Sequence, residues 1–270
     1  MKKIIILLFA ITSTAHIFAQ VTHEFSINGG GGLSTLNYKL SSGQKTLGFG
    51  GDFGLGYTCI FGKYVGIQVG AGLGLYNSKA NLNDSEVITP NLADSDGDVF
   101  DMYTKLANYE EIYKTMFINI PIMAQVQVKK FYAMGGIKIG IPLSSKYNVS
   151  DASLTNKGYY PEYDNWAIKP AFAGFGTFHS QSSEGNLKMG VSATLAIEAG
   201  MKWEVGKIMA IYVGAYFDYG VNNILKENKP FINYINTLPA EFSSNSALPY
   251  VTEKVNLMAA GLKLRFALKK

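Results

Sequence analysis

A strict alternation of apolar and polar residues is the feature that most constrains this chain. In residues 187–205, "LKMGVSATLAIEAGMKWEV", every second residue from Leu187 to Val205 is apolar. A period of two is the signature of a β-strand, because successive side chains point to opposite faces. One face of this strand is wholly apolar, and the other carries Lys188, Glu198, Lys202 and Glu204.

The same alternation recurs along the chain and predicts eight strands. The polar faces are dominated by glycine and by small or uncharged residues, which fit a crowded interior better than a water-facing surface. A soluble sandwich or lipocalin-like barrel would instead direct the apolar face inward. The predicted strands, about 14–19 residues each, are also longer than the usual 5–6. They lie near residues 24–38, 47–61, 64–77, 113–128, 131–145, 187–205, 208–222 and 253–268.

The composition argues against several classes of protein. Charged residues make up 16% of the chain, well below the roughly 25% of an ordinary soluble domain. The formal net charge of +4 is too weak for nucleic-acid binding, which needs a concentrated basic surface. Cys59 is the only cysteine, so neither an internal disulfide nor a multi-cysteine metal site frames the fold.

The first residues have the pattern of a secretory signal peptide. Lys2 and Lys3 precede the short apolar run "IIILLFAI", and small residues lead to a cleavage site after Ala19. The alternative is a buried first helix. We therefore predict a signal peptide over 1–19 and one barrel domain over 20–270.

Short and long connections alternate. Three predicted turns are very short, at Gly62-Lys63, Lys129-Lys130 and Gly206-Lys207, and four connections are longer, near 39–46, 78–112, 146–186 and 223–252. Outer-membrane barrels have this arrangement, with short periplasmic turns and long surface loops. We predict an all-β, eight-stranded antiparallel up-and-down transmembrane barrel in the outer membrane. We expect the barrel to be monomeric and to be surrounded by membrane lipid and lipopolysaccharide.

The segment "FINIPIMAQVQVKKFYAMGGIKIGIPLSSKY" (117–147) resembles the strand–turn–strand core of the PorT-like outer-membrane β-barrels of Gram-negative bacteria. The "GGGGLS" of the first strand and the "KLRF" near the end are also similar. The resemblance implies an outer-membrane barrel, and by analogy an accessory role in secretion or assembly.

Charged residues on the polar strand faces are expected in the barrel interior. Because eight strands enclose a space that side chains can fill, buried charges there must pair. The set predicts an ion-pair network that closes the lumen, and the alternative is a narrow or gated ion pathway. Its members are Asp52, Lys138, Lys188, Glu198, Lys202, Glu204, Asp218, Lys263 and Arg265.

The second long connection is acidic. Asp94, Asp96, Asp98 and Asp101 are spaced like oxygen ligands of a hard cation, which makes them a candidate Ca²⁺ site. The EF-hand pattern fails, because Gly97 is the fourth residue from Asp94 rather than the sixth. A solvated acidic loop is the simpler interpretation.

The third long connection is aromatic. Tyr159, Tyr160, Tyr163 and Trp166 lie within eight residues and could stack on a glycan or anchor a protein partner. The alternative is that they pack together and fold the loop over the barrel mouth.

An enzyme is the least favoured class. After the signal peptide only His23 and His179 remain as histidines, and no motif places a serine or carboxylate beside either. We expect a non-enzymatic barrel with a structural, adhesion or secretion-accessory role through its loops. The alternatives are a narrow, porin-like channel and a lipid-modifying enzyme.

Overall fold

The computed structural model of the protein describes residues 21–40, 43–226 and 229–270. The predicted signal peptide lies outside this range. Within it, no helix has the length and apolar character needed to cross a membrane.

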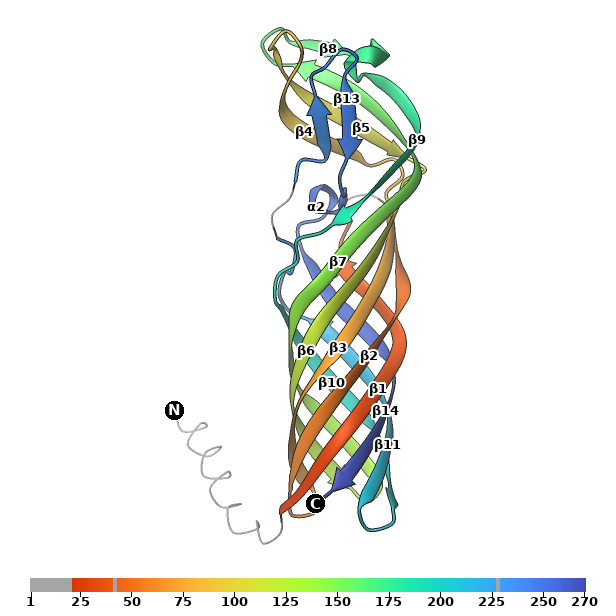
Figure 1. Ribbon diagram of the computed structural model, residues 1–270, viewed down its shortest axis with the longest axis vertical. Helices are drawn as coiled ribbons and strands as arrows, with labels where there is room; N and C mark the ends of the chain where they lie inside the picture. Colours follow the sequence, from red (N-terminus) through yellow and green to blue (C-terminus); the bar gives the residue numbers. More distant parts are fainter. Residues whose placement is uncertain (1–20, 41–42, 227–228) are drawn as a thin grey trace, which may run out of the picture.

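Eight long strands close into a ring and form a tall, narrow barrel (Figure 1). The spatial order is β10-β11-β14-β1-β2-β3-β6-β7, and β7 pairs with β10 to complete the ring. Neighbouring strands are antiparallel, including the first and last, β1 and β14. The predicted all-β barrel is confirmed. The ring strands are β1 (Val21–Tyr38), β2 (Gln44–Phe61), β3 (Val65–Asn81), β6 (Glu110–Val128), β7 (Phe131–Tyr160), β10 (Ser192–Val205), β11 (Met209–Gly220) and β14 (Val255–Lys269).

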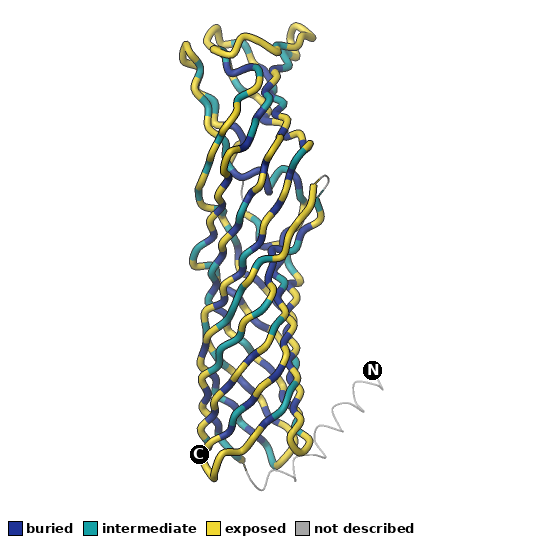
Figure 2. Tube along the Cα trace, turned by 90° about the vertical axis from the view of Figure 1, so that its right-hand side faces the viewer, coloured by how far each residue is buried: buried dark blue, intermediate teal, exposed yellow. Residues whose placement is uncertain are grey.

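The apolar faces point outward. In β10, Leu195 and Ile197 are 53% and 59% exposed, whereas Glu198 between the outward positions is 5% exposed. Exposed and buried residues alternate in this way around the barrel wall (Figure 2). An apolar outer wall of this kind is stable only in an apolar solvent, and the closed ring leaves no strand edge unpaired there.

The two ends of the barrel differ. Tight turns join β2 to β3, β6 to β7 and β10 to β11, and β1 begins and β14 ends at the same side (Figure 1). Gly62, Lys129 and Gly206 have positive φ in these turns. We call this side the short-turn end.

The opposite end is not a set of loops, which corrects the prediction for 78–112 and 146–186. The upper half of β7 continues beyond the ring and pairs with β5 on one side and with β9 on the other. A hairpin, β12–β13, packs over this sheet. We call the whole body the extension. Its elements are β4 (Glu86–Ala93), β5 (Val99–Ala107), β8 (Asn165–Ala167), β9 (Gly176–Asn186), β12 (Ile232–Ile235), β13 (Glu241–Ser244), the 3-10 turn η2 (Ala171–Ala173) and α2 (Leu248–Val251).

The extension has its own apolar core. Phe100, Met102 and Leu106 of β5 point inward with Leu154 of β7, and all are buried. They belong to one hydrophobic cluster that also includes Phe231 and continues down into the barrel mouth. The extension is therefore a folded continuation of the barrel.

Candidate functional site

The lumen holds most of the predicted charge network. Asp52 is half-buried, and the other inward-pointing members are buried, namely Lys138, Glu198, Lys202, Asp218, Lys263 and Arg265. Each comes from a polar strand position, so the period-two pattern placed them correctly.

Glu198 is the centre of one cluster. Its Oε1 lies 2.5 Å from Arg265 Nη2 and accepts a hydrogen bond from the Tyr132 hydroxyl at 2.8 Å. Its Oε2 lies 3.5 Å from Lys263 Nζ, which is also 3.3 Å from Asp52 Oδ2. Pairing and hydrogen bonding offset part of the desolvation cost of burying these charges.

Two further pairs share the lumen. Lys202 Nζ lies 2.8 Å from Glu24 Oε1, and the Tyr212 hydroxyl donates to Glu24 Oε2 at 2.5 Å. Lys138 Nζ lies 2.6 Å from Asp218 Oδ2. Glu24 was left out of the predicted network, although it is the first residue of the strand predicted near 24–38 and lies on the same inward face as Ser26.

Lys188 and Glu204 are corrections. Lys188 precedes β10 and is exposed, because the chain between β9 and β10 leaves the ladder before the barrel wall begins. Glu204 is exposed at the short-turn end, where it pairs with Lys269 and lies 3.5 Å from Lys202 Nζ. The alternation predicts on which side of a strand each side chain lies, but it does not show where the barrel wall ends.

Side chains leave little free space around the network. The cavity bounded by Asp52, Lys138, Glu198, Lys263 and Arg265 has a volume of ≈ 40 Å³, which is room for only a few water molecules at about 10–15 Å³ each. Above it, aromatic rings occupy the barrel mouth, with Tyr76 and Phe117 packed edge to face at 5.9 Å between centroids.

The acidic stretch forms the β4–β5 hairpin, not a cation site. Asp94 Oδ1 accepts the backbone N–H groups of Asp96 and Asp98 at 3.0 Å each. Asp101 Oδ1 accepts the N–H of Asn91. In the described part of the chain, no group of three or more His, Cys, Asp or Glu side chains could hold a metal ion. These carboxylates bind the turn's own donors, so the geometry gives no support to the predicted Ca²⁺ site.

The four predicted aromatic residues divide into two groups. Tyr160 stacks on Phe100 at 5.3 Å between centroids, and its hydroxyl donates to Asp94 Oδ2, as that of Tyr163 does to Asp98 Oδ1. Tyr160 thus helps to fix the extension.

Tyr159 and Trp166 lie together on the outer face of the extension, 5.0 Å apart between centroids. Tyr103 of β5 joins them, with its ring 4.9 Å from Trp166. We call Tyr103, Tyr159 and Trp166 the aromatic cluster. Tyr103 was missed because the sequence does not show that β5 pairs with β7.

A buried carboxyl lies between the barrel mouth and the extension. Glu111 is 0% exposed, and its Oε2 accepts the N–H of Ala247, just before α2, at 3.1 Å. Burial raises the pKa of Glu111 to about 7, while the neighbouring Ser246, Ala247, Tyr113 and Tyr109 groups act to lower it. The alternation in 113–128 did not extend far enough to include this residue.

One serine–histidine contact lies on the outer face. His179 Nδ1 lies 3.0 Å from Ser153 Oγ, across the β7–β9 pair, at an exposed position. Ser180, its neighbour in sequence, does not take part. Within the described residues neither side chain has a carboxylate partner, so the geometry lacks the third member of a triad.

A family profile described as "Outer membrane protein beta-barrel domain" matches residues 18–226. Among curated proteins no sequence matches this chain. Similar solved structures include Ail, the attachment invasion locus protein of Yersinia pestis, in complex with sucrose octasulfate, at 11% identity and a TM-score of 0.33, covering 93% of this chain and 99% of that one. The outer membrane protease OmpT of Escherichia coli follows at 9% identity and a TM-score of 0.27, covering 93% and 96%. The translocator domain of the autotransporter NalP from Neisseria meningitidis has 6% identity and a TM-score of 0.23, covering 97% and 92%.

Proposed function

Because this chain belongs to the family of outer membrane protein beta-barrel domains, we propose that it is a non-enzymatic barrel that binds a partner at the cell surface through its extension. The protein is located in the outer membrane. In such barrels the short turns face the periplasm, which directs the extension outward. The role is adhesion or, following the PorT-like resemblance, accessory work in secretion or assembly.

The outward aromatic cluster on a rigid sheet carries this proposal. Trp166 is 48% exposed, and Tyr159 and Tyr103 support its ring from the same face. Exposed tryptophan and tyrosine anchors provide contact area at small conformational cost. Because β5 and β7 are hydrogen-bonded, the cluster is organised before a partner arrives.

Side-chain replacement in the purified protein tests the proposal. Trp166→Ala and Tyr103→Ala should each weaken binding of the purified protein to an immobilised glycan panel or an envelope-protein panel by about ten-fold or more, as expected for central aromatic anchors. Phe172→Ala is the matched control, since Phe172 is exposed on the same extension but outside the cluster. Equal binding by Trp166→Ala and Phe172→Ala would contradict the proposal.

A narrow channel is the second candidate, favoured by the ionised lining of the lumen. The pairing of these charges and the small residual cavity support a filled lumen instead. For a lipid-modifying enzyme, the Ser153–His179 contact is the relevant geometry. We expect His179→Ala to leave the lipid A composition of the cells unchanged, and an altered composition would favour the enzyme.

A further inference from the structure

Two lysines face each other directly on the outer wall. Lys114 of β6 and Lys146 of β7 are register partners across the antiparallel pair, and both are exposed. Like charges directly opposite each other destabilise a sheet pair. An arrangement of this kind is stabilised when an anion lies between the two ammonium groups.

Lys79, two residues along β3 from the register partner of Lys114, is already paired. Its Nζ lies 2.9 Å from Glu110 Oε1. Within the described residues, neither Lys114 nor Lys146 forms an ion pair. The two are thus distinguished from Lys79 by a lack of acidic partners.

Both lysines line a hollow of ≈ 570 Å³ on the outside of the barrel. Asn148 and Asn186 contribute amide groups to it, and Glu184 contributes one carboxylate. The hollow therefore has two positive charges, one negative charge and uncharged hydrogen-bond donors, which suits a doubly charged oxyanion such as a phosphate monoester.

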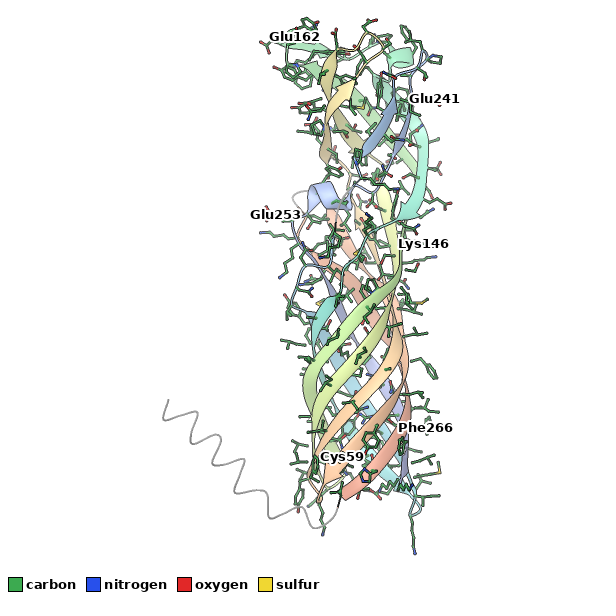
Figure 3. All side chains as sticks on the ribbon, turned by 60° about the vertical axis from the view of Figure 1, so that its left-hand side comes forward. Cys59, Lys146, Glu162, Glu241, Glu253 and Phe266 are labelled. Atoms are coloured by element: carbon green, nitrogen blue, oxygen red, sulfur yellow. The ribbon has the colours of Figure 1, made fainter. Side chains whose placement is uncertain are left out.

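The height of the pair on the wall identifies the source of the anion. Toward the short-turn end, the register partners Met116 and Ser144 come first, and below them the outward residues are apolar, with Ile118 on β6 and Leu143 on β7. On the other side, exposed Asn148 and Ser150 follow. Lys146 lies where the barrel body passes into the extension, far from Phe266 near the short-turn end (Figure 3). The lysines are thus at the upper border of the apolar wall.

We propose that Lys114 and Lys146 bind the phosphate group of an outer-leaflet lipid whose acyl chains lie along Ile118 and Leu143. The phosphate bridges the two ammonium groups, and the hydrocarbon covers the apolar wall below. A basic residue near an anionic membrane surface contributes about 1 kcal/mol, so the pair contributes a factor of roughly thirty in affinity.

Native mass spectrometry of the full chain tests this site. The protein is released from micelles of an uncharged detergent that contain bisphosphorylated lipid A or its dephosphorylated form. Wild type should retain the phosphorylated lipid preferentially, and Lys114→Gln/Lys146→Gln should lose at least about ten-fold of that retention. Lys129→Gln/Lys130→Gln removes the same charge from the short-turn end and should retain the lipid like wild type.

Thermal unfolding gives a second readout, because the substitution should affect stability differently in the absence and in the presence of lipid A. Without lipid A, Lys114→Gln should be as stable as wild type or more stable, because it relieves the like-charge contact. With lipid A, wild type should gain stability and the variant should gain little. The proposal would be overturned if the Lys114/Lys146 variant retained lipid A as well as wild type, or if the Lys129/Lys130 control lost as much lipid A as that variant. It would also be overturned if inorganic phosphate displaced lipid A from wild type as well as free lipid A does.

Discussion

Single side chains in this protein are held in place by partners from distant parts of the chain, and Glu111 is the clearest case. Its raised pKa of about 7 means that the folded protein binds a proton that the unfolded chain releases near pH 4.5. Stability then falls as the pH rises between these values, by about 3 kcal/mol in total at 1.36 kcal/mol per pH unit.

We therefore expect the contact between Glu111 and Ala247 to loosen above about pH 7. Protection factors of residues 245–252, corrected for the base-catalysed intrinsic exchange rate, should be higher at pH 5 than at pH 8. Glu111→Gln keeps an acceptor for the Ala247 N–H but cannot ionise, so its protection factors should be independent of pH in this range. A pH effect of equal size in the Gln variant would exclude Glu111 as its source.

The Glu198–Arg265 pair allows a test of the buried network. Arg265→Met leaves Glu198 with a single cationic neighbour and should lower the free energy of unfolding by about 3–5 kcal/mol. In Arg265→Met/Glu198→Gln the Gln still accepts from Tyr132, so most of that loss should be recovered. Urea unfolding in detergent micelles measures both values. A double variant no more stable than Arg265→Met would show that the ionic contact is not the source of the loss.

Strands β1 and β14, the first and last of the ring, approach each other closely at a pair of glycines. Gly32 and Gly261 are register partners there. A Cβ added at Gly261 would fall on the carbonyl oxygen of Gly31 and 2.8 Å from Gly32 Cα. Gly261→Ala should therefore destabilise the barrel by about 1–3 kcal/mol, as overpacking does.

Gly135 in β7 provides the control for this prediction. A Cβ added there meets no atom within 4 Å, so Gly135→Ala should leave stability unchanged or slightly improved. The fraction of protein that keeps its folded electrophoretic mobility on heating measures both variants. Equal effects of the two substitutions would show that close approach at the β1–β14 pair is not limiting.

The barrel strands were predictable from sequence because an apolar solvent outside and packed side chains inside impose one simple alternation. The extension was not predictable in the same way, because its outward face carries charged residues such as Asp101 and Lys105. By composition alone these residues suggest a loop, and only their position in the alternation indicates a strand. Phe100, Met102 and Leu106 keep the period of two in the same segment. The site residues followed the same division: Lys202 and Arg265 could be placed by facing alone, whereas Tyr103 depends on a pairing between β5 and β7.

The whole molecule is a column closed at two levels, and this determines whether ions can pass. The lower level is the ion-pair network, and the upper level is the set of aromatic rings at the mouth, including Tyr76 and Phe117. Either level alone fills the narrow interior of an eight-stranded ring. We expect wild type to show no conductance steps in planar bilayers.

Opening the column should require changes at both levels. Glu24→Ala/Lys202→Ala removes both partners of one pair and leaves the aromatic level intact, so it should remain silent. Adding Tyr76→Ala and Phe117→Ala should produce steps, provided the variant keeps its heat-modifiable mobility. Steps in wild type, or in the two-residue variant alone, would favour the channel, because one level would then be insufficient to exclude ions. Silence of the folded four-residue variant would instead show that the remaining pairs, Glu198–Arg265 and Lys138–Asp218, or the apolar core of the extension still close the column.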